Sequence, residues 1–157
     1  MKYYKYIFIF ILCISFKIQS DQTKTVSYIF SDENTNQIVM NIEAALARAQ
    51  ASQGIIPKWA AEEITKKANI NYMPIEEIAI ENEIIRHRLV SRLNVWKRSL
   101  DNGAEEYLHF GATTVDIFDT VLVIQIKESL EILITSLYDI EEYLLNLTKD
   151  NIDTYMA

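Results

Sequence analysis

The segment HFGATTVDIFDT, residues 109–120, lies where an irregular stretch of the chain gives way to a very long helical pattern. Thr113 is followed three residues later by Asp116, a spacing typical of a helix N-terminus and an acidic variant of the capping box. A helix start leaves several backbone N–H groups unpaired, with the positive end of the helix dipole behind them. The segment therefore predicts that a long helix begins close to Thr113.

The residue types around this helix start suit an anion. Gly111 lets the backbone come close to a ligand, and Thr113 and Thr114 supply hydroxyl groups. His109 is near enough in sequence to donate a further hydrogen bond. The pattern predicts a seat for a carboxylate or a phosphate. The alternative is a helix cap without a ligand, because Thr-x-x-Asp also occurs at helix starts that bind nothing.

Half of the 157 residues are hydrophobic and 24% are charged, with only three glycines and two prolines. This composition is typical of a helical, folded domain with its own core. The formal net charge of −7 argues against a nucleic-acid partner. Two histidines and one cysteine are too few for a conventional zinc site, and the sequence has neither a Gly-rich phosphate loop nor a Gly-x-Ser-x-Gly elbow. We therefore predict no metal and no cofactor.

Residues 1–20 differ from the rest of the chain. Lys2 and Lys5 precede an apolar run from Tyr6 to Phe16, and polar residues follow. A transmembrane helix needs about 20 apolar residues, so the run is too short to be one. The arrangement predicts a signal-peptide-like leader, and with it the secretory pathway or secretion, with no membrane contact beyond the leader. The alternatives are an organellar leader, an uncleaved anchor, or a cytoplasmic protein with a misassigned start codon.

The first expected helix follows a polar stretch. Residues 21–29 are expected to be loosely held, and Ser31 then opens a helix with acidic residues in its first turn. Gly54 fits as the residue after the helix end. The apolar stripe of this helix consists of Val39, Ile42, Leu46 and Ala49.

Two further helical regions are expected before residue 109. Pro57 suits the first turn of a short helix, residues 57–68. A longer helix is expected over residues 74–100, with apolar residues every three or four positions. Arg86 and His87 are expected inside this helix. His87 is then either a solvated side chain on a charged helix face or part of a site.

No helix breaker occurs from about Val115 to Thr148. Apolar residues in this stretch alternate at spacings of three and four, which is a heptad seam. A helix this long with so much apolar surface needs several neighbouring helices, so the pattern predicts a bundle or a coiled-coil oligomer. The seam consists of Val123, Ile126, Leu130, Leu133, Leu137, Ile140, Leu144 and Leu147.

The segment HFGATTVDIFDT resembles the first signature segment of the fumarase/aspartase superfamily. The similar branch holds adenylosuccinate lyase and 3-carboxy-cis,cis-muconate cycloisomerase, which carry His-aromatic-Gly-x-Thr-Ser/Thr-x-Asp followed by Asp-Thr. The opening helix carries a second resemblance, since residues 43–49 (EAALARA) and the turn 54–57 (GIIP) are similar to the cycloisomerases. Together the similar regions span about residues 30–157.

This resemblance implies an all-α fold. Residues 21–112, after the leader at 1–20, would be the N-terminal helical domain of a lyase. Residues 113–157 would be the first of the long helices that pack together, from all subunits, into the central bundle of a superfamily homotetramer.

The resemblance also implies which residues bind substrate. The two threonines and the aspartate of the signature position a substrate carboxylate, and the two histidines add hydrogen bonds. The family often has Thr and Asp around the first histidine, where this chain has Ile85 and Arg88, and Val115 replaces a usually polar residue. The implied substrate-binding residues are His87, His109, Thr113, Thr114 and Asp116.

The first choice of reaction is adenylosuccinate cleavage with release of fumarate, in purine nucleotide metabolism, because the Arg86-His87 pair is similar to these lyases. The amino-acid sequence of the opening helix favours a cycloisomerase instead. Either choice implies a small dicarboxylate-type substrate and a homo-oligomer.

The family's catalytic base, a Ser on a mobile loop, and its assisting second-signature His do not occur in the sequence and are expected beyond Ala157. The 157 residues are therefore expected to be inactive alone and to hold no catalytic residue. Two alternatives remain: a catalytically inactive, truncated helical interaction module, and an inactive subunit that completes the sites of a longer paralogue.

Overall fold

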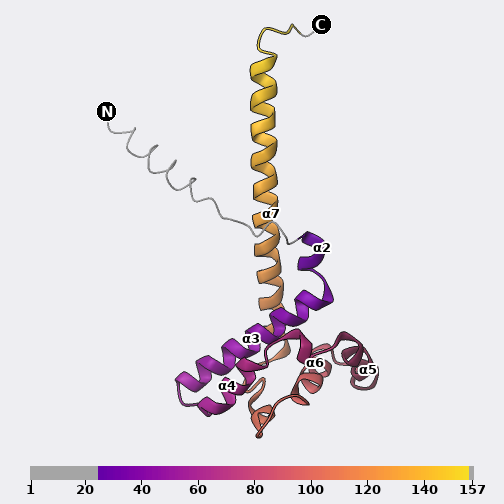
Figure 1. The fold of residues 1–157 in the computed structure, drawn as a ribbon, viewed down its shortest axis with the longest axis vertical. Coiled ribbons are helices and arrows are strands. Elements are labelled where there is room, and N and C mark those ends of the chain that lie inside the picture. Colours follow the sequence, from indigo (N-terminus) through magenta and orange to yellow (C-terminus); the bar gives the residue numbers. More distant parts are fainter. Residues whose placement is uncertain (1–24, 156–157) are drawn as a thin grey trace, which may run out of the picture. The chain divides into compact units, whose positions relative to one another are not determined.

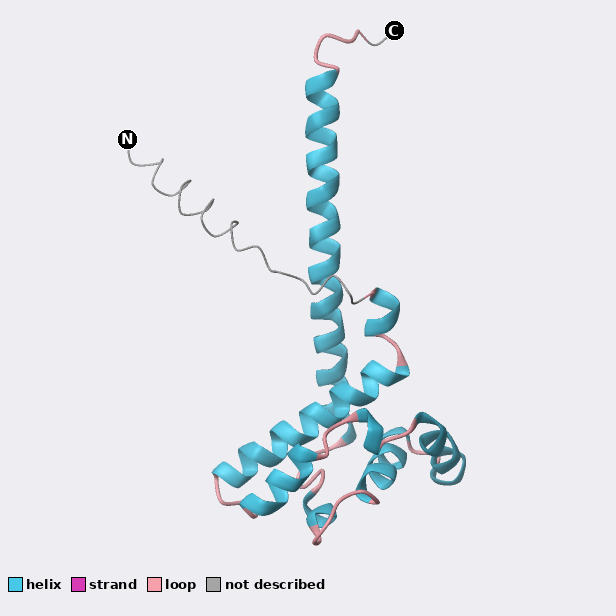
Figure 2. Cartoon of the chain, viewed as in Figure 1, coloured by secondary structure: helices cyan, strands magenta, loops and turns pink. Residues whose placement is uncertain are grey.

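A computed structural model describes residues 25–155, and every regular element in that range is helical, with no strand (Figure 2). The predicted all-α fold is therefore confirmed. The expected leader at residues 1–20 lies outside the described residues. No helix within the described range has the length and apolar character needed to cross a bilayer. The elements are α2 (Val26–Ile29), α3 (Asp32–Ser52), α4 (Lys58–Lys66), η1 (Ile70–Tyr72), α5 (Ile75–Ile85), α6 (Arg88–Lys97), η2 (Ala104–Tyr107) and α7 (Thr114–Asp150).

The stretch before the first long helix is more ordered than the sequence indicates. Val26–Ile29 forms one helical turn, and the Ile29 side chain is completely buried. The backbone carbonyl of Ile29 accepts hydrogen bonds of 2.8 Å from the side-chain amides of both Asn34 and Gln125. The expectation of a loosely held segment up to Ile29 is wrong over these residues, because Ile29 fills a core position and its carbonyl is satisfied.

Helix α3 has the ends that the sequence predicts. The Ser31 side chain accepts a hydrogen bond from the Asn34 backbone N–H at 3.2 Å, which caps the helix start. After Ser52, Gly54 takes a left-handed conformation with φ +72°, as the residue beyond a helix end commonly does. Helix α4 then runs back beside α3 (Figure 1). Small buried residues let these two helices approach closely: Ala44 and Ala47 on α3, and Ala60 and Ala61 on α4.

The core of residues 26–128 lies among α3, α4, α6 and the start of α7. Trp96 is its largest fully buried side chain, and Met40, Ile64 and Leu89 are buried to within 1%. Helix α7 contributes Ile117 and Val121, which are each 2% exposed. These contacts anchor the first turns of α7 to the helices that precede it in the chain.

The expected single helix over residues 74–100 is two helices. Helix α5 ends at Ile85, where Arg86 is left-handed with φ +53° and its N–H bonds to the Asn82 carbonyl. His87 is extended, and its Nδ1 accepts a hydrogen bond from the Val90 N–H at 3.2 Å, so His87 caps the start of α6. The expectation that Arg86 and His87 lie inside a helix is wrong, because each residue satisfies a different helix end.

A buried lysine fixes the loop that leads toward η2. Lys67 is 8% exposed, and its ammonium bonds to Glu63 Oε1 at 2.8 Å, to Asp101 Oδ2 at 2.7 Å and to the Ser99 carbonyl. These hydrogen bonds from Lys67 hold the pKa values of Glu63 and Asp101 below their ordinary range. The loop after α6 is thereby tied to the end of α4.

The chain forms two compact units. One unit is Val26–Glu128, which contains the core; the other includes α7 from Ser129 onward. In this second unit the α7 side chains are largely exposed, including the seam residues Leu130, Leu133, Leu137, Ile140, Leu144 and Leu147. The predicted long helix is confirmed, and much of its apolar surface has no cover from the described residues.

Candidate substrate-carboxylate site

The segment that precedes α7 has an unusual backbone. His109 has φ +64° and Gly111 has φ +71°, so two residues within three positions are left-handed. Glycine takes this conformation without cost, whereas a residue with a Cβ is strained by about 1–2 kcal/mol. The preceding Leu108 is buried in the core, at 4% exposure. The double reversal after Leu108 brings the chain back toward α3.

Two side chains of α3 hold this segment. The Glu43 Oε1 atom lies 2.7 Å from His109 Nδ1, and Gln50 Nε2 donates a hydrogen bond of 2.6 Å to the Phe110 carbonyl. Glu43 and His109 are 66 positions apart in the sequence. Both contacts lie within the Val26–Glu128 unit. The segment before α7 is thus positioned by the first long helix of the fold.

Glu43 is a carboxyl group in the core. Its side chain has no exposed surface, while that of His109 is 19% exposed. Burial raises the pKa of Glu43, and the nearby His109 and Lys97 act in the opposite direction. Glu43 Oε2 is buried without a hydrogen-bond partner among the described residues. One side of this carboxyl therefore bonds to His109 and the other is unsatisfied.

Helix α7 begins as predicted. Its first residue is Thr114, and Asp116 Oδ2 accepts a hydrogen bond from the Thr113 backbone N–H at 3.0 Å. The acidic capping interaction that the sequence predicts is therefore present. Thr113 and Asp116 are exposed and Thr114 is half-buried, so the helix start is open to a ligand. The hydroxyl groups, the helix dipole and the N–H groups of the first turn all favour an anion here.

The predicted site residues fall into two groups. His109, Thr113, Thr114 and Asp116 belong to one short segment at the start of α7. His87 is exposed at the start of α6, and its Nδ1 is used by the Val90 N–H. Among the described residues, no hydrogen bond or ion pair joins His87 to the other four. Four of the five predicted residues therefore lie in one segment, in which a hydrogen bond joins Thr113 to Asp116, and the role of His87 stays a prediction.

The sequence analysis did not identify the two α3 side chains that hold residues 109–110. Glu43 and Gln50 had no assigned role, although Glu43 lies in the middle of the apolar side of α3, between the buried Val39 and Ala47 four residues away on either side. An ionisable residue in such a stripe was the available signal, because charged side chains are rarely buried without a partner. Nothing local in the sequence identifies that partner.

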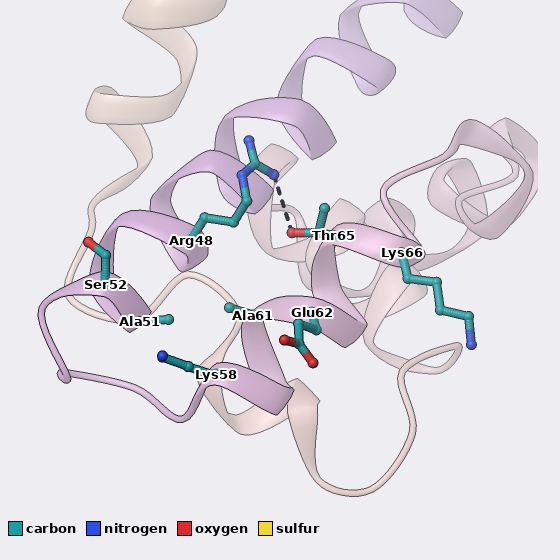
Figure 3. A pocket seen from close by; sticks show the side chains of 8 residues that line it. All are labelled: Arg48, Ala51, Ser52, Lys58, Ala61, Glu62, Thr65 and Lys66. Carbon is teal, nitrogen blue, oxygen red and sulfur yellow. Dashed lines mark hydrogen bonds between the residues drawn. The ribbon is translucent and has the colours of Figure 1, made fainter.

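A separate groove of about 460 Å³ lies between α3 and α4 (Figure 3). Arg48 Nη1 on α3 donates a hydrogen bond of 3.2 Å to Thr65 Oγ1 on α4, and Lys66 extends away from the other labelled side chains. None of the five predicted site residues lines this groove. Its lining residues are Arg48, Ala51, Ser52, Lys58, Ala61, Glu62, Thr65 and Lys66.

The described residues contain no cluster of three or more histidine, cysteine or acidic side chains arranged to bind a metal ion. What the α7 start offers is a set of hydrogen-bond donors: backbone N–H groups, hydroxyls and an imidazole. Such donors bind a carboxylate and stabilise negative charge that develops on it.

A profile of the protein family described as "Lyase" matches residues 17–157. This chain belongs to that lyase family. The adenylosuccinate lyase of Methanocaldococcus jannaschii is 37% identical over 129 residues, which are 82% of this chain and 28% of that protein. The relatives support the predicted branch of the fumarase/aspartase superfamily.

Two solved structures share the fold. A fumarate lyase from Mesorhizobium matches with a TM-score of 0.73 and 32% identity, over 80% of this chain and 29% of that one. A β-carboxy-cis,cis-muconate cycloisomerase from Acinetobacter calcoaceticus matches with a TM-score of 0.70 and 28% identity, over 80% of this chain and 30% of that one. This chain spans less than a third of the length of each of these relatives.

The left-handed glycine of the site gives a direct test of its backbone. A Cβ at Gly111 would meet only Gln50 Nε2, at an ordinary distance of 3.9 Å, so a substitution is limited by conformation and not by space. We expect Gly111→Ala to lower the free energy of unfolding by about 1–2 kcal/mol, and Gly111→Asn by less, because asparagine tolerates the left-handed region better. Urea unfolding followed by circular dichroism measures both. Equal stability of the alanine variant and the native chain would contradict the assigned backbone.

Proposed function

We propose that this chain belongs to a lyase of the adenylosuccinate lyase type, which releases fumarate by β-elimination. It would supply the part of the active site that binds the substrate carboxylate, made of His109, Thr113, Thr114 and Asp116 and called the substrate-carboxylate corner below. The observation that carries the proposal is the helix start at Thr113–Asp116, which presents hydroxyls and first-turn N–H groups beside a histidine held by α3. The similarity to adenylosuccinate lyases at 37% identity and below supports the choice of reaction.

The chemistry gives each part of the site a task. When a lyase removes the proton next to a carboxylate, negative charge builds up on the carboxylate oxygens. Donors already aimed at those oxygens stabilise that charge more than they stabilise the bound substrate, which is the requirement for catalysis. Thr113 and Thr114 would donate through their hydroxyls, and His109 through its ring. The positive end of the α7 dipole adds to the same effect.

The base and the acid must come from elsewhere in the assembled enzyme. In the resembled family they are a Ser on a mobile loop and a second-signature His, and neither segment occurs in these 157 residues. Our proposal therefore assigns substrate binding and charge stabilisation to this chain and leaves proton transfer to segments outside it. Asp116 caps α7 through the Thr113 N–H, so its task is to set the direction of the first turn.

We also propose that α7 packs against copies of itself in a homo-oligomer, with a tetramer expected from the family. The side chains of all eight seam residues are between 44% and 64% exposed. Exposed apolar surface at heptad spacing is stabilised by helix association. Packing of the α7 helices of several chains would bring the α7 start of one chain close to residues of other chains.

A cycloisomerase is the second candidate. The similarity to the Acinetobacter structure and the amino-acid sequence of the opening helix favour it. The substrates of cycloisomerases of this kind also carry carboxylates. The two candidates share the carboxylate-binding corner and differ in what surrounds the rest of the substrate. The α7 start therefore does not discriminate between them, and substrate assays do.

The proposed reaction is tested with the protein at its full natural extent. We expect fumarate to be released from adenylosuccinate, and Thr114→Val to lower kcat/KM by roughly 10²-fold or more, as for the loss of one oxyanion-type donor. The matched control is Thr65→Val, which alters a hydroxyl in the α3–α4 groove and should leave kcat/KM unchanged. Turnover of a carboxymuconate with no adenylosuccinate cleavage would select the cycloisomerase. Equal effects of the two variants would remove Thr114 from the site.

The oligomer is tested by light scattering coupled to size-exclusion chromatography. We expect the native chain to have a mass several times 18.2 kDa, and the double variant Leu133→Lys, Leu137→Lys to have a lower one, because two charges would be buried in the seam. Asp139→Lys with Glu142→Lys is the matched control, since both residues are exposed and lie off the seam. A native chain that stays monomeric at high concentration would contradict the proposed interface.

A further inference from the structure

We infer that Glu43 is a positioning residue: its buried carboxylate fixes a proton on Nδ1 of His109, so that Nε2 is the ring nitrogen offered to substrate. This inference deepens the proposed function, because it rests on His109 belonging to the substrate-carboxylate corner. Its physical basis is independent of any reaction, since it concerns one hydrogen bond within the Val26–Glu128 unit.

An ionised Glu43 would determine which atom holds the proton. An ionised carboxylate only accepts hydrogen bonds, and Glu43 Oε1 lies 2.7 Å from His109 Nδ1. Nδ1 must then be the donor, in a charge-assisted hydrogen bond of the short, strong kind. Within the part of the chain that the structure describes, no hydrogen bond involves Nε2 of His109. A neutral ring would therefore accept through Nε2, and a charged ring would donate through it.

Substrate chemistry selects between these two states. A substrate carboxylate that approaches Nε2 places the ring between two negative groups, and both attract a positive imidazolium. His109 then donates from both nitrogens, to Glu43 on one side and to the substrate on the other. An acidic partner on Nδ1 is a common way to orient a functional histidine ring. Glu43 would act only through His109 and would not touch the substrate.

The burial of Glu43 is difficult to explain by packing alone. A buried carboxyl with one unpaired oxygen costs stability, and an apolar side chain in its place would not. Burial raises the pKa of Glu43, and the charge and hydrogen bond of His109 and the charge of Lys97 oppose this only in part. Features that cost stability in this way concentrate at functional sites. Among the described residues, the Glu43 side chain makes one hydrogen bond, the bond to His109.

The backbone around His109 supports the same conclusion. His109 is held at φ +64°, a strained conformation for a residue with a side chain, and Gln50 fixes the next residue through the Phe110 carbonyl. Gln50 therefore positions the backbone, and Glu43 positions the ring. These two hydrogen bonds from α3 leave the His109 imidazole little freedom to rotate.

His87 provides an internal contrast for the test. Its Nδ1 accepts a hydrogen bond from the Val90 N–H, so a neutral His87 carries its proton on Nε2. The chain has only these two histidines. We therefore expect opposite ring tautomers at the two positions, with the Nδ1 proton belonging to His109.

The experiment is ¹⁵N NMR of the chain labelled at its histidine ring nitrogens, with His87→Gln used to assign the signals. We expect a protonated Nδ1 at His109, with a proton resonance shifted downfield, and an unprotonated Nδ1 at neutral His87. In Glu43→Gln that downfield resonance should be lost, because the charged acceptor is gone. Glu62→Gln removes an exposed carboxyl from α4 and should leave it in place.

An unprotonated Nδ1 at His109 in the native chain would overturn the inference, and so would a resonance that persists unchanged in a folded Glu43→Gln variant. If Glu43→Gln fails to fold, the native spectrum decides alone. No substrate is needed, so the ring assignment can fail while fumarate release is observed. Equally, the ring assignment can hold in a protein that cleaves nothing.

Discussion

The hydrogen bond between Glu43 and His109 connects the first long helix to the segment that begins the last one. Without it and the neighbouring Gln50–Phe110 bond, the reversal at His109 and Gly111 would lack a partner on α3. The start of α7 follows within a few residues, where the Thr113 N–H bonds to Asp116. The strained backbone, the buried carboxyl and the open helix start are therefore parts of one arrangement that offers donors to an anion.

Much of the helical layout could be predicted because its signals are local. Ser31 and Gly54 mark the ends of α3, Pro57 precedes α4, and the heptad pattern extends α7 without a break. The division at Arg86 and His87 could not be predicted in the same way. Neither residue is a strong helix breaker, and the ends of α5 and α6 depend on a left-handed Arg86 and on an imidazole cap. The one-turn helix before α3 was missed because its stability comes from contacts with Asn34 and Gln125.

The candidate site shows the same division between local and long-range information. The capping interaction of Asp116 follows from a three-residue spacing, so the sequence predicts it. The partner of His109 lies 66 positions away, and only the fold brings the two together. His87 was grouped with His109 by resemblance, yet in this chain it caps α6. Among the described residues, no hydrogen bond or ion pair joins the two histidines.

A corner of this kind makes sense as part of an assembly. In our proposal it supplies hydrogen-bond donors and the positive end of a helix dipole for a carboxylate, and neighbouring helices would cover the exposed apolar surface of α7. The proposed site is best tested by a crystal structure of the protein at its full natural extent with fumarate bound. We expect one fumarate carboxylate at the start of α7, accepting hydrogen bonds from the Thr113–Thr114 segment and from Nε2 of His109. Fumarate bound in the α3–α4 groove, or bound elsewhere with the α7 start empty, would contradict it.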